Sequence, residues 1–390
     1  MSFEKINTVG IVGSGAMGSG IAQVAAQAGE NVILFDSNAA ALQKAKSNLD
    51  STLKKLTEKG KVSADDAKNI LGRIRFASMV NDFKNCNLII EAIVEILEVK
   101  QKVFSDLEKI VSEKCVLASN TSSLSITSIA SACTKPERVI GIHFFNPAPV
   151  LPLVEIIPGI STEKNLAGNV KTLIESWKKI LVIAKDTPGF IVNRVARPFY
   201  GESIRVYEEG FADFATIDWA MKEIGGFKMG PFELMDLIGN DVNYTVTETV
   251  WKQFFHDPKY KPSLTQKRLF EAKQFGKKSG KGYYDYSAPM PEPKKDKTLG
   301  ENIFWRVLVM LINEASDVLY YGVATKEDID LAMTKGVNYP KGLLKWADEK
   351  GVENCLKKME KLYVEYGEDR YRPSVQLKKM VREGKKKFYE

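Results

Sequence analysis

The first strand, turn and helix constrain the fold more than any other stretch of the chain. Thr8 to Val12 form a short apolar run typical of a buried strand, and Ile21 to Ala28 place apolar and small residues at helical spacing. Three glycines join the two segments. Gly13 suits a tight turn, Gly15 lets a pyrophosphate approach the backbone, and Gly18 lets the helix pack closely on the strand. This order predicts a dinucleotide-binding α/β domain with the pyrophosphate at the helix N-terminus.

Two further features support a nucleotide site. Ala16 and Met17 lie at the expected start of the helix, where unpaired N–H groups and the helix dipole favour an anion. A second apolar strand, Asn31 to Phe35, ends at Asp36. A carboxylate at that strand end accepts hydrogen bonds from a ribose diol and repels a 2′-phosphate. We therefore expect NAD as the cofactor rather than NADP, and a glycine turn without a ligand is the alternative.

Strands and helices continue to alternate beyond this segment. The pattern predicts a parallel sheet with right-handed crossovers, in which ligands bind at the carboxyl ends of the strands. The expected strands are Leu88 to Ala92, Val116 to Ala118, Val139 to Phe145, Leu153 to Ile157 and Ile180 to Ala184, and the expected helices are Asn38 to Lys59, Ser63 to Gly72, Leu97 to Val111 and Leu124 to Ala130. Residues that carry chemistry should therefore gather where strands end.

One of the two histidines of the chain lies at such a strand end. His143 follows Val139 to Ile142 and precedes Pro147, which cannot continue a β-ladder. A histidine among apolar residues is commonly a core side chain, and that is the alternative interpretation. Glu155 lies in the middle of the next apolar strand and favours a functional role for His143. A buried carboxylate needs a partner, and it can stabilise the imidazolium that forms when the histidine takes up a proton. His143 and His256 are the only imidazoles that could exchange a proton near neutral pH.

A hydroxyl-rich loop, Ser119 to Ser123, follows the strand that ends at Ala118. Ser and Thr often cap helices, so Ser122 or Ser123 would serve as the cap of the helix expected from Leu124 to Ala130. Ser122 would equally suit a contact with substrate at the sheet edge. The sequence leaves these two interpretations of Ser122 open.

Composition limits the class of protein. At 390 residues and 44% hydrophobic, the chain can bury more than one core, and two or three domains are expected. Its 56 basic and 49 acidic residues are interleaved, so the formal charge of +7 does not form an arm for nucleic acid. The four cysteines show no metal-ligand spacing, and no metal site is expected. Neither a membrane span nor a leader pattern is visible, so we expect a cytoplasmic protein.

From Pro188 onward the pattern consists of long helical segments, and one part of it repeats. Arg194 to Asp236 align without gaps on Arg306 to Asp348. The stretch between the copies carries three prolines and a run of charge, which is typical of a linker. The predicted organisation is an α/β domain over residues 1–187, a helical domain over 188–286, a linker over 287–300 and a second helical copy over 301–390.

These motifs resemble those of the 3-hydroxyacyl-CoA dehydrogenase family, including the 3-hydroxybutyryl-CoA dehydrogenases. The resemblance covers Lys5 to Tyr286 and rests on the glycine turn and on Glu91 to Glu95, Ser119 to Leu124, His143 to Pro147, Asp186 to Arg194 and Met229 to Leu234. It implies a Rossmann-type α/β domain followed by two all-α domains of the family's C-terminal type. It also implies NAD-dependent oxidation of (S)-3-hydroxyacyl-CoA to 3-oxoacyl-CoA, or the reverse reduction, with short acyl chains such as 3-hydroxybutyryl-CoA.

The resemblance further implies roles for single residues. His143 would be the general base and Glu155 its partner, while Ser122 and Asn193 would bind the reacting oxygen or the thioester carbonyl. Asn146 would support the site. The remaining positions implied by the resemblance are cofactor contacts at Glu95, Lys100 and Asn120 and looser CoA contacts at Thr52 and Lys59.

The second helical copy departs from the first where the site would be. Asn193 corresponds to Trp305, and the motif from Met229 to Glu233 becomes Lys341 to Lys345. We therefore expect the second copy to be structural. Single-copy members of the family pair through this domain, so a fused duplicate would supply the same contact within one chain. We expect a pseudo-dimeric monomer, and a homodimer is the alternative.

Two other functions fit the same fold. One is a dehydrogenase that acts on a free hydroxy acid or a sugar acid, and the other is a non-catalytic NAD-binding scaffold. The joint presence of His143, Glu155, Ser122 and Asn193 argues against the scaffold. The basic stretch from Lys378 to Lys387 is interpreted as a solvated helix end, with contact to a CoA phosphate as the alternative.

Overall fold

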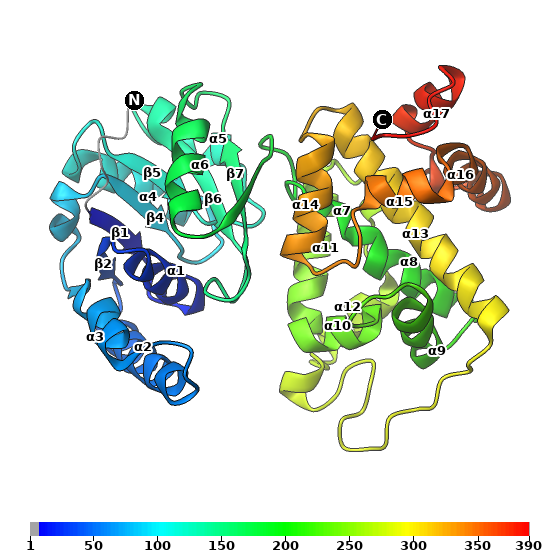
Figure 1. The fold of residues 1–390 in the computed structure, drawn as a ribbon, viewed down its shortest axis with the longest axis horizontal. Helices are drawn as coiled ribbons and strands as arrows, with labels where there is room; N and C mark the ends of the chain where they lie inside the picture. Colours follow the sequence, from blue (N-terminus) through cyan, green and yellow to red (C-terminus); the bar gives the residue numbers. More distant parts are fainter. Residues whose placement is uncertain (1–7, 390) are drawn as a thin grey trace. The chain divides into compact units, whose positions relative to one another are not determined.

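The computed structural model describes residues 8–389, which form two compact units, the first ending at Thr187 and the second beginning at Pro188. The first is an α/β unit and the second is wholly helical (Figure 1). In the first unit, the strands are β1 (Thr8–Val12), β2 (Asn31–Phe35), β3 (Ile74–Ala77), β4 (Leu88–Glu91), β5 (Val116–Ser119), β6 (Val139–Phe144), β7 (Leu153–Pro158) and β8 (Ile180–Ile183). Its helices are α1 (Ala16–Gln27), α2 (Ala39–Glu58), α3 (Ala64–Gly72), α4 (Leu97–Ile110), α5 (Ile126–Ala130) and α6 (Leu166–Ser176).

The strands form one sheet in the order β3-β2-β1-β4-β5-β6-β7-β8. All neighbours are parallel except β6 and β7, which pair antiparallel, so β7 and β8 run opposite to the other six. The expectation of an all-parallel sheet is therefore wrong at this edge. The connection between Phe144 and Leu153 is short, and a parallel pairing would need a crossover of a dozen or more residues.

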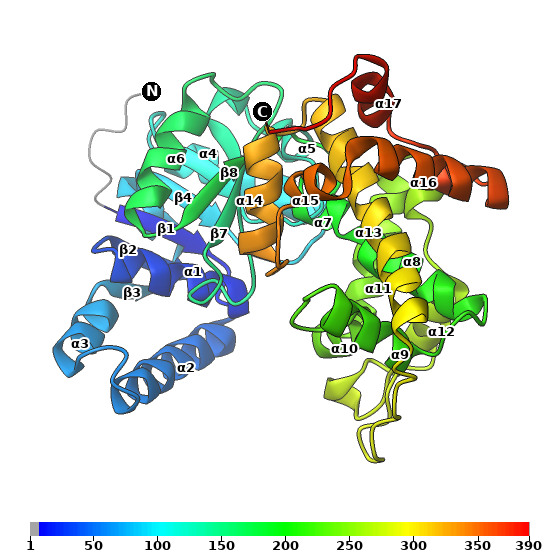
Figure 2. The same cartoon turned by 45° about the vertical axis from the view of Figure 1, so that its right-hand side comes forward.

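The edge strand β3 was not expected from the sequence. It is four residues long and half of it is not buried, so its apolar pattern is weak. Beyond this edge, α2 and α3 stand away from the rest of the sheet in both views (Figures 1 and 2). The central strands β4, β5 and β6 are buried at every position, which is typical of strands covered on both faces.

The helical unit contains two sets of helices. The first set is α7 (Val192–Val195), α8 (Arg197–Glu208), α9 (Phe214–Trp219), α10 (Pro231–Ile238), α11 (Asn240–Gln253) and α12 (Leu264–Glu271). The second set is α13 (Lys297–Tyr320), α14 (Lys326–Gly336), α15 (Leu343–Lys350), α16 (Val352–Tyr366) and α17 (Val375–Arg382). Since α9, α10 and α11 begin at 214, 231 and 240 and α14, α15 and α16 begin at 326, 343 and 352, each start recurs after 112 residues. The two-copy helical architecture predicted from the sequence is confirmed.

The boundary of the predicted linker differs from the observed one. Asp296 caps α13, which begins at Lys297, so the last residues of the expected linker are already helical. In the first copy the corresponding helix is interrupted between α7 and α8, next to Pro198. The second copy has Met310 at the matching position, and its helix is continuous.

Buried carboxylates perform the same task in both copies. Asp218 accepts hydrogen bonds from the backbone N–H of Phe232 and Glu233, each at 2.9 Å. Asp330 accepts the matching bonds from Leu344 at 2.8 Å and Lys345 at 3.0 Å. Each aspartate therefore pairs with N–H groups in the first turn of the next helix, α10 or α15, which would otherwise lack partners.

The end of the chain completes this pattern in the second copy. Asp348 accepts hydrogen bonds from the backbone of Phe388 at 2.6 Å and of Tyr389 at 3.0 Å, and the Tyr389 hydroxyl donates to Asp330 at 3.0 Å. The lysines between 378 and 387 are exposed, whereas Phe388 is buried. The basic stretch therefore ends in a segment that folds back onto the second copy.

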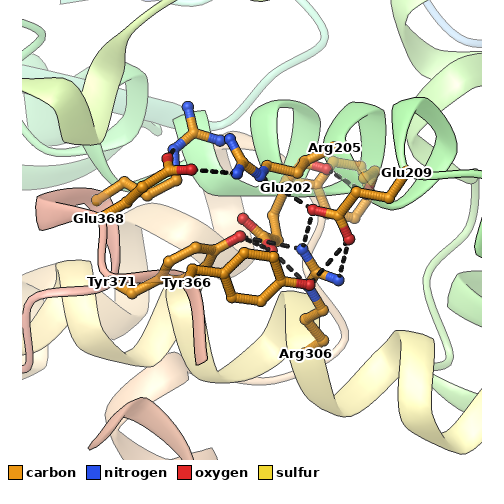
Figure 3. A network of polar contacts seen from close by, with 10 residues as sticks. Glu202, Arg205, Glu209, Arg306, Tyr366, Glu368 and Tyr371 are labelled. Atoms are coloured by element: carbon orange, nitrogen blue, oxygen red, sulfur yellow. Dashed lines mark hydrogen bonds and ion pairs between the residues drawn. The ribbon is translucent and has the colours of Figure 1, made fainter. Parts of the chain in front are cut away.

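Arginine and glutamate pairs join the two copies reciprocally. Arg194 of the first copy donates through Nε to Glu314 of the second at 2.6 Å, and Arg306 of the second donates through Nε to Glu202 of the first, also at 2.6 Å. Tyr260 and Tyr371 donate to the same two glutamates at 2.6 and 2.9 Å. Figure 3 shows Arg306 between Glu202 and the more exposed Glu209, which it binds through both terminal nitrogens.

Arg194 binds Glu314, and the residues aligned with these two, Arg306 and Glu202, bind each other in the same way. The contact therefore has the pattern of an isologous two-fold interface formed within one chain. Burial opposes ionisation of Glu314, but the charges of Lys259 and Arg194 and the hydrogen bond from Tyr260 outweigh this effect and lower its pKa to about 2. Lys259 also pairs with Asp317. The buried network therefore stabilises the fold when Glu314 is ionised.

We predict that Glu314→Gln lowers the free energy of unfolding at pH 7 by about 3 kcal/mol or more, because it leaves Arg194 and Lys259 without their shared carboxylate. The pKa of Glu314 is lower in the folded than in the unfolded state, so its contribution is present above about pH 4.5 and is lost as the pH falls toward 2. Urea unfolding between pH 7 and pH 2.5 should show the difference between native chain and variant narrowing over that window.

The matched control for this prediction is Glu353→Gln, which removes an exposed ion pair with Lys357. This control should leave the urea midpoint unchanged. A Glu314→Gln variant whose deficit is the same at pH 7 and pH 2.5 would contradict the electrostatic account.

Candidate active site

The glycine turn lies between β1 and α1, and each glycine has a distinct environment. Gly13 has a φ of +97°, which L side chains rarely adopt. A Cβ on Gly18 would lie 1.8 Å from the carbonyl oxygen of Gly13, so only glycine fits there. A Cβ on Gly15 would meet no protein atom within 4 Å. The backbone at Gly15 is therefore open to a ligand, while the other two glycines are required by the turn itself.

The first turn of α1 is suited to bind an anion. Gly15 is its N-cap and cannot supply a side-chain oxygen, and no acidic residue lies in that first turn, where Ala16 and Met17 follow the cap. The first N–H groups of a helix have no partner within the helix and carry the positive end of its dipole. The residues present therefore fit the pyrophosphate of a dinucleotide.

Asp36 lies directly after β2, beside the glycine turn. One of its carboxylate oxygens accepts from the backbone N–H and the hydroxyl of Ser14, both at 2.8 Å, and the other accepts from the Asn38 N–H at 2.9 Å. Burial opposes ionisation, but these hydrogen bonds outweigh it and hold the pKa of Asp36 below its usual value. The carboxylate is thus ionised and fixed in position, which suits an acceptor for a ribose diol.

A cavity of about 440 Å³ lies between the glycine turn and α2. Its lining includes Ser14 and Gly15 on one side and Lys44, Asn48 and Thr52 on the other. Lys59 does not line this cavity and lies two helical turns beyond Thr52, at the C-terminal cap of α2. Of the two expected CoA contacts, the structure therefore brings Thr52 and not Lys59 to the glycine turn.

Glu91 and Lys100 form a buried pair behind the carboxyl end of β4. The Lys100 ammonium lies 2.5 Å from Glu91 and 3.2 Å from Glu95. Glu91 also accepts from the Ser119 hydroxyl at 2.7 Å, across the β4–β5 pair. Lys100 is 1% exposed, and its ammonium contacts the loop at the sheet edge through its ion pair with Glu95. Glu91 and Glu95 were recognised as parts of one motif, but no sequence pattern showed that Lys100 neutralises them.

Glu95 organises the loop that carries Ser122. It accepts from the Thr121 hydroxyl, from the Ser122 N–H at 3.0 Å and from the Ser123 hydroxyl at 3.1 Å. Burial raises the pKa of Glu95, but the charge of Lys100 and these donors outweigh it, and the net shift is downward. The expected cofactor contact at Glu95 is therefore an ionised carboxylate that also shapes the Ser122 loop.

Ser122 and Ser123 do not cap the helix that follows. The cap of α5 is Ser125, and Asp186 reinforces it by accepting from the Ile126 and Thr127 N–H groups at 3.0 and 2.7 Å. The capping interpretation of Ser122 is therefore wrong. The role of Asp186 was missed because it is distant from α5 in sequence and no local pattern links the two.

His143 and Glu155 lie directly opposite each other on β6 and β7. Residues opposite each other in an antiparallel pair point to the same face of the sheet. Imidazole Nδ1 lies 2.8 Å from Oε2 of Glu155, which is fully buried, and His143 is 5% exposed. The pairing that the sequence suggested is thus present, and Nε2 is the ring nitrogen directed away from the carboxylate.

Three amide side chains complete the set of expected residues. Asn120 accepts through Oδ1 from the Phe144 N–H at 2.8 Å, so it ties the β5 loop to the end of β6. Asn146 is exposed in the loop after β6 and precedes Pro147 through a cis peptide bond. Asn193 is half-buried in α7 of the helical unit. Asn120 therefore binds the residue next to His143, Asn146 follows His143 by three residues, and Asn193 belongs to the other unit.

Metal and membrane features are both missing from the part of the chain that the structure describes. Among residues 8–389, no three His, Cys, Asp or Glu side chains are grouped so that they could hold a metal ion. No helix within the same range is long and apolar enough to cross a membrane.

Comparison with known proteins identifies the family. The sequence model of the 3-hydroxyacyl-CoA dehydrogenase NAD-binding domain matches residues 8–187, and that of the C-terminal domain matches 189–286 and again 303–388. The chain belongs to the 3-hydroxyacyl-CoA dehydrogenase family. As a member it is an NAD-dependent oxidoreductase that acts on 3-hydroxyacyl-CoA thioesters.

Individual relatives match over different lengths. A 3-hydroxyadipyl-CoA dehydrogenase of Escherichia coli is 37% identical over 95% of this chain and 96% of its own length. The crystal structure of a 3-hydroxybutyryl-CoA dehydrogenase from Escherichia coli has a TM-score of 0.93 at 35% identity, covering 97% of this chain and 99% of that one. An (S)-3-hydroxybutyryl-CoA dehydrogenase from Ralstonia eutropha matches 73% of this chain with its full length, at 39% identity and a TM-score of 0.70.

The glycine environments predict opposite effects for two alanine substitutions. Gly18→Ala should lower the free energy of unfolding by about 1–3 kcal/mol, because its Cβ collides with the turn. Gly15→Ala should leave stability intact and weaken NADH binding by about tenfold or more, equivalent to about 1.4 kcal/mol. Thermal unfolding and fluorescence titration with NADH measure the two effects. Normal NADH affinity in Gly15→Ala would show that the cofactor does not approach this backbone.

Proposed function

We propose that the protein oxidises short-chain (S)-3-hydroxyacyl-CoA thioesters, or reduces the corresponding ketones, with His143 as general base paired to Glu155. The observation that carries this proposal is the 2.8 Å contact between His143 Nδ1 and the fully buried Glu155. Relatives named for 3-hydroxybutyryl-CoA and 3-hydroxyadipyl-CoA support short chains, and the second name describes a chain with a carboxylate at its far end.

The geometry divides the proton chemistry between two nitrogens. Because Glu155 engages Nδ1, the tautomer with the proton on Nδ1 is favoured, and Nε2 is left as the basic atom that takes the proton of the 3-hydroxyl. The imidazolium that results is stabilised by the adjacent carboxylate. In the reductive direction the same imidazolium returns the proton to the carbonyl oxygen.

The remaining residues position the reactants. The glycine turn and Asp36 would hold NAD, whose nicotinamide would supply the acceptor for the hydride of C3. Ser122, held by Glu95 through its backbone N–H, and Asn193 contact the reacting oxygen or the thioester carbonyl, and Asn120 and Asn146 support the end of β6. Thr52 extends the same site toward CoA, while Lys59 remains a weaker candidate because it lies outside the cavity. Oriented binding of this kind contributes several kcal/mol to catalysis.

We predict that His143→Gln lowers kcat by about 10²–10⁴-fold, the range for loss of a general acid or base, while NADH binding is retained. Glu155→Gln should produce a smaller loss, because the imidazole stays in place without its charge partner. The matched control is His256→Gln, since His256 is the other histidine of the chain and is exposed. NADH absorbance with acetoacetyl-CoA measures all three. Turnover intact in His143→Gln would exclude the proposed base.

The same NADH absorbance assay distinguishes a dehydrogenase of CoA thioesters from a dehydrogenase of free hydroxy acids. Acetoacetate and acetoacetyl-CoA present the same ketone, and only the second carries the CoA handle. We expect turnover of the thioester, and activity restricted to the free acid would favour the alternative function. A series of thioesters from C4 to C16 then measures the preference for chain length.

We also propose that the protein is a pseudo-dimeric monomer, in which the second helical copy takes the place of a partner subunit. The reciprocal Arg194–Glu314 and Arg306–Glu202 pairs support this proposal. We expect sedimentation equilibrium to give a single species near 43.6 kDa at all concentrations tested. A dimer that persists on dilution would contradict it and would favour the homodimer.

A further inference from the structure

Arg197 is a buried cation without a carboxylate partner. Four arginines are buried in the described part of the chain, and three of them, Arg138, Arg194 and Arg306, pair with glutamate. Arg197, which is 7% exposed, instead donates to the backbone oxygen of Asn193 at 2.8 Å and to the Thr247 hydroxyl at 3.0 Å. Removing a guanidinium from water is costly, and two neutral acceptors compensate for only part of that cost.

The groups around Arg197 are aromatic. Its guanidinium lies 5.0 Å from the ring centre of Tyr200, a cation–π contact. Burial lowers the pKa of Arg197, and the groups that oppose this shift are the phenols of Tyr200 and Tyr339. Since arginine stays protonated in proteins, the site holds a positive charge that no group of the chain neutralises.

Tyr339 supplies a second polar group with no partner. The Tyr339 side chain is 4% exposed, and its buried hydroxyl makes no hydrogen bond to another group of the protein. Burial raises the pKa of Tyr339 far above its usual value, so the hydroxyl keeps its proton as a donor. Native proteins seldom leave a buried hydroxyl unsatisfied, and the Tyr339 hydroxyl can donate to a group bound beside Arg197.

The cluster combines both helical copies. Arg197 belongs to the first copy, and its counterpart in the second is Val309. Tyr339 belongs to the second copy, and its counterpart in the first is Phe227, whose ring it contacts at 5.0 Å. A single-copy relative with phenylalanine at this position would lack the hydroxyl. The second copy therefore contributes a specific polar group in addition to the interface.

The position of the cluster relates it to the reacting end of the substrate. Arg197 binds the backbone of Asn193, the residue that we propose contacts the substrate oxygen. Four residues of helix span about 6 Å along the axis, which is comparable with the length of a few methylene groups. An acyl chain that starts at Asn193 can thus bring a group at its far end to Arg197.

We propose that Arg197 and Tyr339 bind a carboxylate at the far end of the acyl chain, so that the preferred substrate is a short dicarboxylyl-CoA thioester. The planar guanidinium and the phenol hydroxyl provide the donors that a carboxylate accepts. This inference rests on the proposed dehydrogenase function and adds a specificity determinant to it. Arg197 pairs with the substrate carboxylate as the other three buried arginines pair with glutamates.

The test compares two thioesters in the full-length protein. NADH formation is measured with (S)-3-hydroxyadipyl-CoA and with (S)-3-hydroxybutyryl-CoA, and the ratio of the two kcat/KM values is the readout. We expect the native chain to favour the dicarboxylyl substrate by at least tenfold. Turnover of neither substrate would refute the proposed function itself, whereas equal turnover of both would refute only this inference.

Substitutions assign the preference to the two residues. Arg197→Met should lower the ratio by about 10–100-fold, the range for a hydrogen bond to a charged group, and Tyr339→Phe by about 3–10-fold. Tyr339→Phe removes one oxygen that has no partner in the folded chain, so it should not reduce the unfolding temperature. The matched control is Tyr283→Phe, which removes another buried hydroxyl without a partner and should leave the ratio unchanged.

A purely structural role for Arg197 predicts a different result. If Arg197 only holds the Asn193 backbone, Arg197→Met lowers kcat/KM equally for both thioesters and the ratio stays constant. A constant ratio in both Arg197→Met and Tyr339→Phe overturns the proposal.

Discussion

The carboxylate of Glu155 is fully buried in β7, where it would be costly without a partner, and the antiparallel register with β6 places His143 directly opposite. This one contact engages Nδ1 of the histidine, so Nε2 is the ring nitrogen directed away from the carboxylate. The short connection after β6 makes β7 run antiparallel, and this direction brings Glu155 across from His143. Glu91 and Lys100 are also buried charges, and they pair with each other behind the loop that carries Ser122.

In the helical unit, buried charges of one copy find their partners in the other copy. Glu202 and Glu314 each lie inside the unit and are each neutralised by an arginine of the other copy, so neither half satisfies its buried charges alone. Duplication places both halves of such an interface in one chain, and loop closure within a chain costs less than association of two molecules. The two copies differ at positions such as Phe227 and Tyr339.

Sequence patterns predicted the features that depend on neighbours in the chain. The glycine turn, Asp36 at the end of its strand and the repeat at constant spacing are local or periodic, and so they are visible without coordinates. Features that depend on distant partners were not predicted. Ser122 was a plausible helix cap by position, but Asp186 and Ser125 take that role because β8 ends beside α5. The sequence likewise did not show that the Lys100 ammonium pairs with both Glu91 and Glu95.

The sequence by itself determined the order of strands and helices apart from β3, the nucleotide turn, the duplication and the family. Glycine spacing, hydrophobic period and motif order are properties of the linear chain. The tertiary structure decided the direction of β7, the partner of each buried charge and the isolation of Arg197. These depend on which segments meet in space, and a charged side chain carries no local signal of whether a carboxylate will lie beside it. That is why the one buried arginine without such a partner, among the residues that the structure describes, became apparent only in the folded protein.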